Sequence, residues 1–175
     1  MRLEKKTFAL ACSIRTVAPK TPTALDGVKW PPLPPTDYCF YPVVNTWTVP
    51  VPLDPDRLRK ALAKALSVYS INAARLGINP RTSTWQLNFV NQAVPLTIGT
   101  SSRPGPFAVD WNGKKIQNGA PIHQDYYDEV YPAGATPDEY AANPLMKLKV
   151  TTWTETGQTS IMLSQSYHLG WAAAA

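Results

Sequence analysis

The chain has 175 residues, a length that predicts one domain with its own core and excludes two domains of ordinary size. Hydrophobic residues make up 44% and charged residues 17%, which excludes a largely disordered chain, and 18 prolines against 9 glycines disfavour a helical bundle. The net charge of +5 comes from scattered lysines and arginines, so no nucleic-acid-binding stripe is predicted.

The beginning of the chain predicts a strand rather than a leader or a membrane anchor. The apolar run from Phe8 to Cys12 follows basic residues, but it is shorter than a secretory core and Glu4 precedes it. We therefore expect a strand over residues 7–17. No window of the sequence approaches the ~20 apolar residues of a membrane span, so no membrane span is predicted.

A proline-rich connector separates this strand from the next one. Residues 20–35 contain five prolines, which exclude a helix interior or a central strand and favour an extended surface loop over a docking motif: Pro22, Pro31, Pro32, Pro34 and Pro35. The stretch from Tyr38 to Val51 is rich in aromatic and β-branched residues, so it predicts a strand that is interrupted at Pro42.

The clearest helix signal begins at Asp54, a candidate N-cap followed by Pro55 at the first helical position. Apolar residues then recur at helical spacing, with Arg57, Lys60 and Lys64 left for the solvated side. Gly77 and Pro80 are expected to end this segment. The predicted buried stripe comprises Leu58, Leu62, Ala65, Leu66, Tyr69 and Ala73.

The middle of the chain gives weaker signals. Residues 84–90 alternate as a half-buried strand, and Ala93 to Gly99 leads out into a turn-rich segment. Between residues 100 and 143 only short strand-like pieces are predicted, such as Phe107 to Trp111. Three tyrosines mixed with acidic residues indicate a loop packed on its own aromatics rather than a ligand cage: Tyr126, Tyr127 and Tyr131.

The last part of the chain, residues 146–168, predicts a hairpin that leads to a histidine. Residues 146–151 alternate between apolar and polar, and a turn near Glu155-Thr156-Gly157 reverses the chain into Ser160 to His168. A histidine at a strand exit sits on a rigid element, and its near-neutral pKa suits the removal of a proton from a hydroxyl or thiol at pH 7. His168 is therefore the candidate general base.

Other chemistry-bearing residues give no site. His123 lies in a predicted loop without a partner at metal-ligand spacing, so a surface or turn histidine is favoured. Cys12 and Cys39 lack metal spacing, and reduced cytosolic thiols are favoured over a disulfide. Nucleophile-elbow, phosphate-loop, HExxH and paired-cysteine motifs are missing from the sequence. A lone histidine is more often structural, so His168 needs support beyond its position.

That support comes from several blocks whose order resembles the N-terminal half of the BAHD-type acyltransferases, including their fungal relatives. These enzymes move acyl groups from coenzyme A to alcohols or amines. The last block leads to His168, which matches the histidine of the family signature H-x-x-x-D. The other blocks are Val17–Thr23 (V-x-P-x-x-P-T), the aromatic run Tyr38–Tyr41, the helix Leu53–Leu66, the ending Ile71–Leu76 with Ala74 in place of glycine, and Pro144–Thr151.

The resemblance implies an α/β fold with a mixed sheet flanked by helices, similar to the chloramphenicol-acetyltransferase-like half-domain of a coenzyme A-dependent acyltransferase. It implies that His168 is the general base, that an acyl-CoA thioester is the substrate, and that no metal or bound cofactor is needed. The acceptor would be a hydroxyl or amine of a small metabolite, and the expected location is cytoplasmic. Residues 1–175 would form a single N-terminal acyltransferase-like domain.

Two features depart from the family pattern. The family's aspartate, which holds the loop after the histidine, is Ala172 here. Ala172 is the first of four alanines, which we interpret either as placeholders for unidentified side chains or as an added tail. The second half of the family fold, with its D-F-G-W-G type motif, is not found, so a missing C-terminal half or a protein partner is expected to cover the interdomain face. The alternative hypothesis is a non-catalytic structural or binding subunit that docks in a larger assembly.

Overall fold

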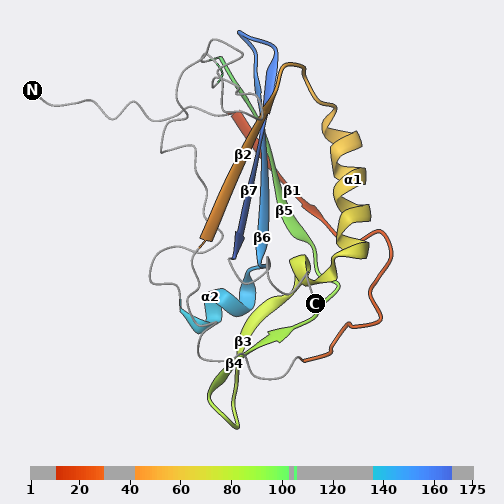
Figure 1. Ribbon diagram of the computed structural model, residues 1–175, viewed down its shortest axis with the longest axis vertical. Helices are drawn as coiled ribbons and strands as arrows, with labels where there is room; N and C mark the ends of the chain where they lie inside the picture. Colours follow the sequence, from red (N-terminus) through yellow and green to blue (C-terminus); the bar gives the residue numbers. More distant parts are fainter. Residues whose placement is uncertain (1–10, 30–41, 103–104, 106–135, 167–175) are drawn as a thin grey trace, which may run out of the picture.

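A computed structural model describes residues 11–29, 42–102, 105 and 136–166, and Figure 1 shows their arrangement. The main sheet has five strands in the order β1-β5-β6-β7-β2, and β3 and β4 form a second, two-stranded sheet. The strands are β1 (Ala11–Val17), β2 (Pro42–Val49), β3 (Arg75–Asn79), β4 (Thr84–Asn88), β5 (Val94–Ser101), β6 (Met146–Trp153) and β7 (Gln158–Ser166). The helices are α1 (Pro55–Val68), the 3₁₀ helix η2 (Ser70–Ala73) and α2 (Pro137–Ala142).

The main sheet is mixed, as the sequence predicts. β5 and β6 are parallel, whereas the pairs β1–β5, β6–β7 and β7–β2 are antiparallel. Helix α1 runs alongside this sheet (Figure 1). The predicted fold class, α/β with a mixed sheet and flanking helices, is confirmed.

The main core lies between α1 and one face of the sheet. Leu66 is fully buried, and Leu62 is 8% exposed one turn earlier on the same helix. Removal of such side chains from water is the dominant stabilising term of a small domain. The strand and η2 residues of this cluster are Val17, Ala73, Val94, Leu96, Met146, Leu148 and Val150.

Helix α1 begins where the sequence predicts. The Asp54 side chain accepts a hydrogen bond from the Asp56 backbone N–H at 2.9 Å, and Pro55 occupies the first turn. This satisfies one of the backbone donors that a helix start leaves without a partner. The start is therefore determined locally, by residues adjacent in sequence.

The predicted end of the helix is wrong. The helix ends at Val68, because Tyr69 leaves helical geometry with φ −109° and ψ 65°, and η2 follows. Gly77 does not end a helix but lies inside β3, where a Cβ would meet the Asn88 side chain at 2.6 Å. Pro80 opens the turn after β3.

The predicted apolar stripe is accordingly only partly correct. Ala65 is exposed and Tyr69 is 56% exposed, although both stand at helical spacing with Leu62. Ala73 is fully buried, but from η2 rather than from α1. The chain leaves the helix because Ala74 and the strand that follows it are buried in a second cluster. The stabilisation from this burial cannot be predicted from the periodicity of residues 58–73.

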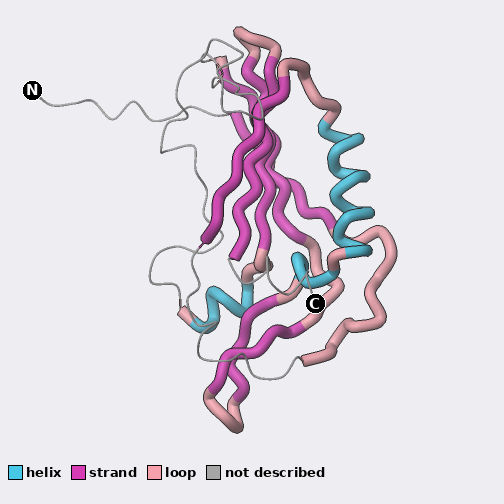
Figure 2. Tube along the Cα trace, viewed as in Figure 1, coloured by secondary structure: helices cyan, strands magenta, loops and turns pink. Residues whose placement is uncertain are grey.

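This second cluster joins the β3–β4 hairpin to α2, apart from the main sheet (Figure 2). The predicted strand over residues 84–90 is confirmed as β4, but β3 was predicted as part of a helix. The Trp85 and Tyr140 rings pack edge to face, with centroids 5.2 Å apart. Helix α2 was not predicted, although Thr136 and Glu139 form a capping box. The buried members of the cluster are Ala74, Leu76, Leu87 and Leu145.

Two prolines stand in strands at positions where they remove few hydrogen bonds. Pro42 is the first residue of β2, an edge strand of the main sheet, and residues 38–41 of the predicted strand lie outside the described part of the chain. Pro95 pairs with Thr16 on β1, whereas pairing of β5 with β6 begins at Leu96. The segment from Ala93 to Gly99 is predicted to lead out into a turn-rich segment, but from Val94 onward it belongs to β5, which lies between β1 and β6.

The segment after β1 is fixed along α1. The Lys20 N–H donates to the Ala63 carbonyl oxygen at 2.9 Å, and the Thr21 N–H donates to Ser67 Oγ at 2.8 Å. The described part of the predicted connector is therefore a loop that lies along α1 at its start, but it is not extended throughout, because residues 24–27 form a turn in which the Val28 N–H donates to the Leu25 carbonyl oxygen at 2.9 Å. Other predictions lie outside the described residues, namely those on Pro31–Pro35, Tyr38–Tyr41, Cys39, Phe107–Trp111, His123 and the tyrosines Tyr126, Tyr127 and Tyr131.

Candidate functional site

The predicted hairpin is present, and β7 lies inside the main sheet between β6 and β2. Its turn spans residues 154–157 and uses Gly157 at φ +67°, a backbone conformation that favours glycine. β7 ends at Ser166, two positions before His168. A strand hydrogen-bonded on both sides is a rigid support for whatever follows it.

The side chains of β7 divide between the two faces of the sheet. Ile161 and Leu163 pack against the main core beside α1. Ser160, Met162 and Ser164 alternate with them and are fully buried. Because side chains alternate along a strand, these even-numbered residues belong to the face away from α1.

Hydroxyl groups from three neighbouring strands gather on that face. In the register, Ser160 lies opposite Thr48 of β2 and Thr151 of β6. Ser160 Oγ accepts a hydrogen bond from Trp153 Nε1 at 2.8 Å and lies 2.9 Å from Thr48 Oγ1, with which it shares another. We call this surface the polar face, and it comprises Thr46, Thr48, Thr151, Ser160 and Ser164.

Several buried polar atoms on this face have no hydrogen-bond partner in the described part of the chain: Thr46 Oγ1, Thr151 Oγ1, Ser164 Oγ and, beside them, Gln158 Nε2. A buried hydroxyl without a partner costs about 1–3 kcal/mol. In the described part of the chain, Ser160 and Thr48 are therefore the bonded hydroxyls of the polar face, whereas those of Thr46, Thr151 and Ser164 are buried without a partner.

Replacement of Thr151 by valine is expected to raise the free energy of unfolding by about 1 kcal/mol, because the apolar methyl group removes an unpartnered buried hydroxyl. The matched variant Ser160→Ala should lower it by about 1–3 kcal/mol, because it removes bonded contacts to Trp153 and Thr48. Urea denaturation measures both. A Thr151→Val protein that is less stable than the wild type would show that the hydroxyl is bonded.

The predicted site residues are not among those that the structure describes. His168 and Ala172 follow the end of β7, and His123 lies between residues 106 and 135. Their positions relative to one another therefore stay predictions. In the described segments no group of three or more His, Cys, Asp or Glu residues could hold a metal ion.

The described residues also bear on two other expectations. Cys12 has a free thiol and is exposed on β1. None of the helices in the described segments is long and apolar enough to cross a membrane.

The polar face was missed by sequence analysis, although part of its signal is present in the chain. Residues 158–166 read Gln-Thr-Ser-Ile-Met-Leu-Ser-Gln-Ser, so serines and glutamine recur in a strand flanked by apolar residues. A strand with polar residues on one face is ordinarily predicted to expose that face to water. Only the register with β2 and β6 shows that hydroxyls of three strands are buried together.

Comparisons with known proteins find similar chains among the solved structures. No protein-family model matches the chain, and no curated protein sequence matches it. Among solved structures, the crystal structure of vinorine synthase is similar, with 20% sequence identity and a TM-score of 0.48. The similarity covers 89% of this chain and 37% of that chain, so this chain spans well under half of the length of vinorine synthase.

Proposed function

We propose that the chain carries part of the site of an acyltransferase that moves an acyl group from an acyl-CoA thioester to a hydroxyl or amine of a small metabolite. The observation that carries this proposal is the ordered series of blocks that resembles the N-terminal half of BAHD-type acyltransferases and ends at His168. Four of its blocks lie in the described residues: Val17–Thr23 along α1, the capped helix α1, Ile71–Leu76 in η2 and β3, and Pro144–Thr151 at the start of the β6–β7 hairpin.

In this proposal His168 is the general base. The imidazole takes the proton of the acceptor hydroxyl or amine, whose oxygen or nitrogen forms a bond to the thioester carbonyl carbon. The carbon–sulfur bond then breaks, and coenzyme A leaves as a thiol that receives a proton from the imidazolium. The position of His168, just after an internal strand of the sheet, supports this role because a base must be held within hydrogen-bond reach of its acceptor.

The whole site is proposed to need more than this chain. A second half of the fold or a protein partner would cover the interdomain face and complete the acyl-CoA surface, and the expected location is the cytoplasm. Coenzyme A is a substrate in this proposal and not a resident cofactor.

The test is consumption of acyl-CoA by the full-length native protein, with a panel of alcohols and amines as acceptors. Free coenzyme A should be measured by chromatography, because the exposed thiol of Cys12 would react with a thiol reagent. Acceptor-dependent release of coenzyme A is the expected result. Release that does not exceed hydrolysis with any donor and acceptor of the panel would contradict the proposal.

A second candidate function is a non-catalytic structural or binding subunit. It is favoured by Ala172, which stands where the family has a carboxylate, and by large apolar side chains exposed on both edge strands of the main sheet. These are Ile14 on β1, 75% exposed, and Trp47 on β2, 51% exposed. Peptide mass spectrometry of the residues after Trp171 distinguishes the two: aspartate at position 172 favours the enzyme, and alanine favours the subunit.

A further inference from the structure

A pocket of about 560 Å³ lies where the chain passes from β2 into α1. This volume falls within the range of small-molecule sites in proteins. The pocket is remote in sequence from His168, and the proposed acyl transfer does not use it. Its apolar lining comprises Val51, Pro52, Leu53, Leu58 and Ala61.

The walls of the pocket are fixed to the rest of the fold. The Leu53 N–H donates to Thr159 Oγ1 at 3.0 Å, which holds the loop on β7. The Leu58 N–H donates to the Asp54 carbonyl oxygen at 3.0 Å, in the first turn of α1. Because both walls are anchored, the pocket is preformed, which lowers the entropic cost of binding.

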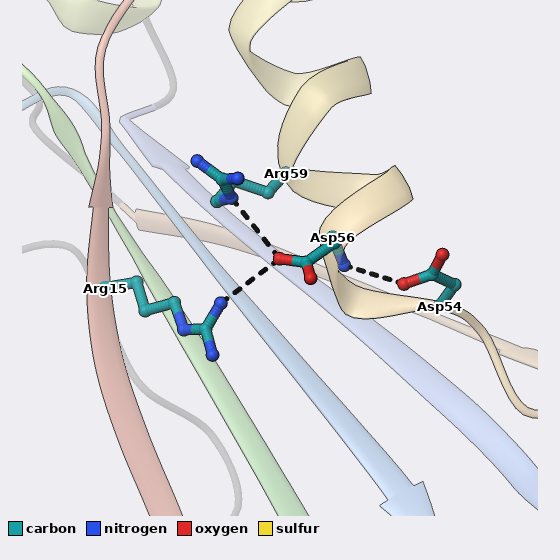
Figure 3. Close-up of polar contacts among 4 residues, drawn as sticks. All are labelled: Arg15, Asp54, Asp56 and Arg59. Atoms are coloured by element: carbon teal, nitrogen blue, oxygen red, sulfur yellow. Dashed lines mark hydrogen bonds and ion pairs between the residues drawn. The ribbon is translucent and has the colours of Figure 1, made fainter.

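The charged side chains near the pocket differ in the partners that they have within the protein. Asp54, one of the lining residues, caps α1 through Asp56 N, as Figure 3 shows. Asp56 lies outside the lining and pairs with two guanidinium groups, Arg15 at 3.3 Å and Arg59 at 3.6 Å (Figure 3). Both carboxylates are therefore engaged by groups of the protein.

Arg57 is the other charged residue of the lining, and it is exposed. In the described part of the chain no carboxylate forms an ion pair with it. Its guanidinium presents parallel N–H donors that match a carboxylate or a sulfonate. The pocket thus combines an apolar lining with one carboxylate, Asp54, which accepts a hydrogen bond from the Asp56 N–H, and one guanidinium, Arg57, which forms no ion pair in the described part of the chain.

We propose that this pocket binds a small amphipathic anion, a molecule with an apolar body and one acidic group. The apolar body would lie against Val51, Leu53, Leu58 and Ala61, and the acidic group would pair with Arg57. Burial of the body supplies the affinity and the ion pair supplies the orientation.

The test uses 1-anilinonaphthalene-8-sulfonate, whose fluorescence rises on binding to apolar surfaces, and N-phenyl-1-naphthylamine, its analogue without the sulfonate. Arg57→Gln is expected to weaken binding of the sulfonate about fivefold, the size of an exposed ion pair, and to leave the neutral analogue unchanged. Ala61→Phe should weaken both probes by filling the pocket. Lys60→Gln, an exposed neighbour on α1 outside the lining, is the charge-matched control and should change neither.

Methyl chemical shifts of Val51, Leu53 and Leu58 locate the sulfonate probe, and they should move in the wild type but not in Ala61→Phe. Equal losses of affinity in Arg57→Gln and Lys60→Gln would show that only net charge matters and would overturn the proposal. Binding that is unaffected by Ala61→Phe would overturn it as well, because the probe would then lie elsewhere. Helical circular dichroism checks that each variant is folded.

Discussion

Replacement of His168 by alanine is expected to lower acyl-CoA turnover by about 10²–10⁴-fold, because a positioned general base contributes that much to the rate. The loss should fall mainly on kcat, since the imidazole acts on the proton that moves in the chemical step. Steady-state release of coenzyme A from the full-length native protein measures the effect.

The matched control is His123→Ala, which alters the other histidine of the chain. This variant should keep its rate within about twofold of the wild type, because the sequence predicts a surface or turn histidine and substitutions at such positions have small effects. Similar losses in both variants would indicate damage to the fold rather than removal of a base. A His168→Ala protein with wild-type turnover would contradict the assignment of the base outright.

Replacement of Leu66 by alanine is expected to lower the free energy of unfolding by about 2–5 kcal/mol, because it leaves a cavity in a fully buried position. Leu66 belongs to the cluster that joins α1 to the main sheet, so the loss should affect the whole cooperative transition. Urea denaturation followed by circular dichroism measures the difference.

Val68→Ala is the control on the same helix, because Val68 is 73% exposed. Its expected effect is within about 0.5 kcal/mol, as for other exposed substitutions. If Leu66→Ala cost less than about 1 kcal/mol, the helix would not be packed on the sheet as described.

Local signals predicted the start of α1 correctly. Asp54 and Pro55 act through backbone groups one or two residues away, so their effect does not depend on the rest of the fold. The β6–β7 hairpin was predicted for a related reason: its two strands are adjacent in sequence and alternate, and Gly157 permits the tight turn between them.

Long-range burial explains the elements that were predicted wrongly. Residues 69–76 continue a helical spacing, but Ala74 and Leu76 are buried against Leu87 and Leu145 in the second cluster. β5 contains Pro95 and Gly99, which weaken its strand signal. Its place between β1 and β6 depends on pairing with residues about 50 or more positions away, such as Ile98 with Val150.

The candidate site shows the same contrast between local sequence signals and contacts between distant residues. His168 could be named as a candidate from the sequence, because it follows a predicted strand and matches the histidine of a family motif, and this assignment stays a prediction. The polar face could not, because Thr46, Thr151 and Ser164 come from strands that only the register brings together. The pocket beside Arg57 was missed as well, since the spacing of Arg57 predicts only that it is solvated, and the structure shows the apolar lining next to it.

The sequence by itself determined the fold class, the start of α1 and the hairpin that leads to His168, because these depend on capping, alternation and turn residues close together in the chain. The tertiary structure alone decided the end of α1, the place of β5 in the sheet, the burial of hydroxyls on the polar face and the pocket between β2 and α1. The physical reason is that burial and strand register are set by contacts between distant residues, which can outweigh local preferences of about 1 kcal/mol or less per residue.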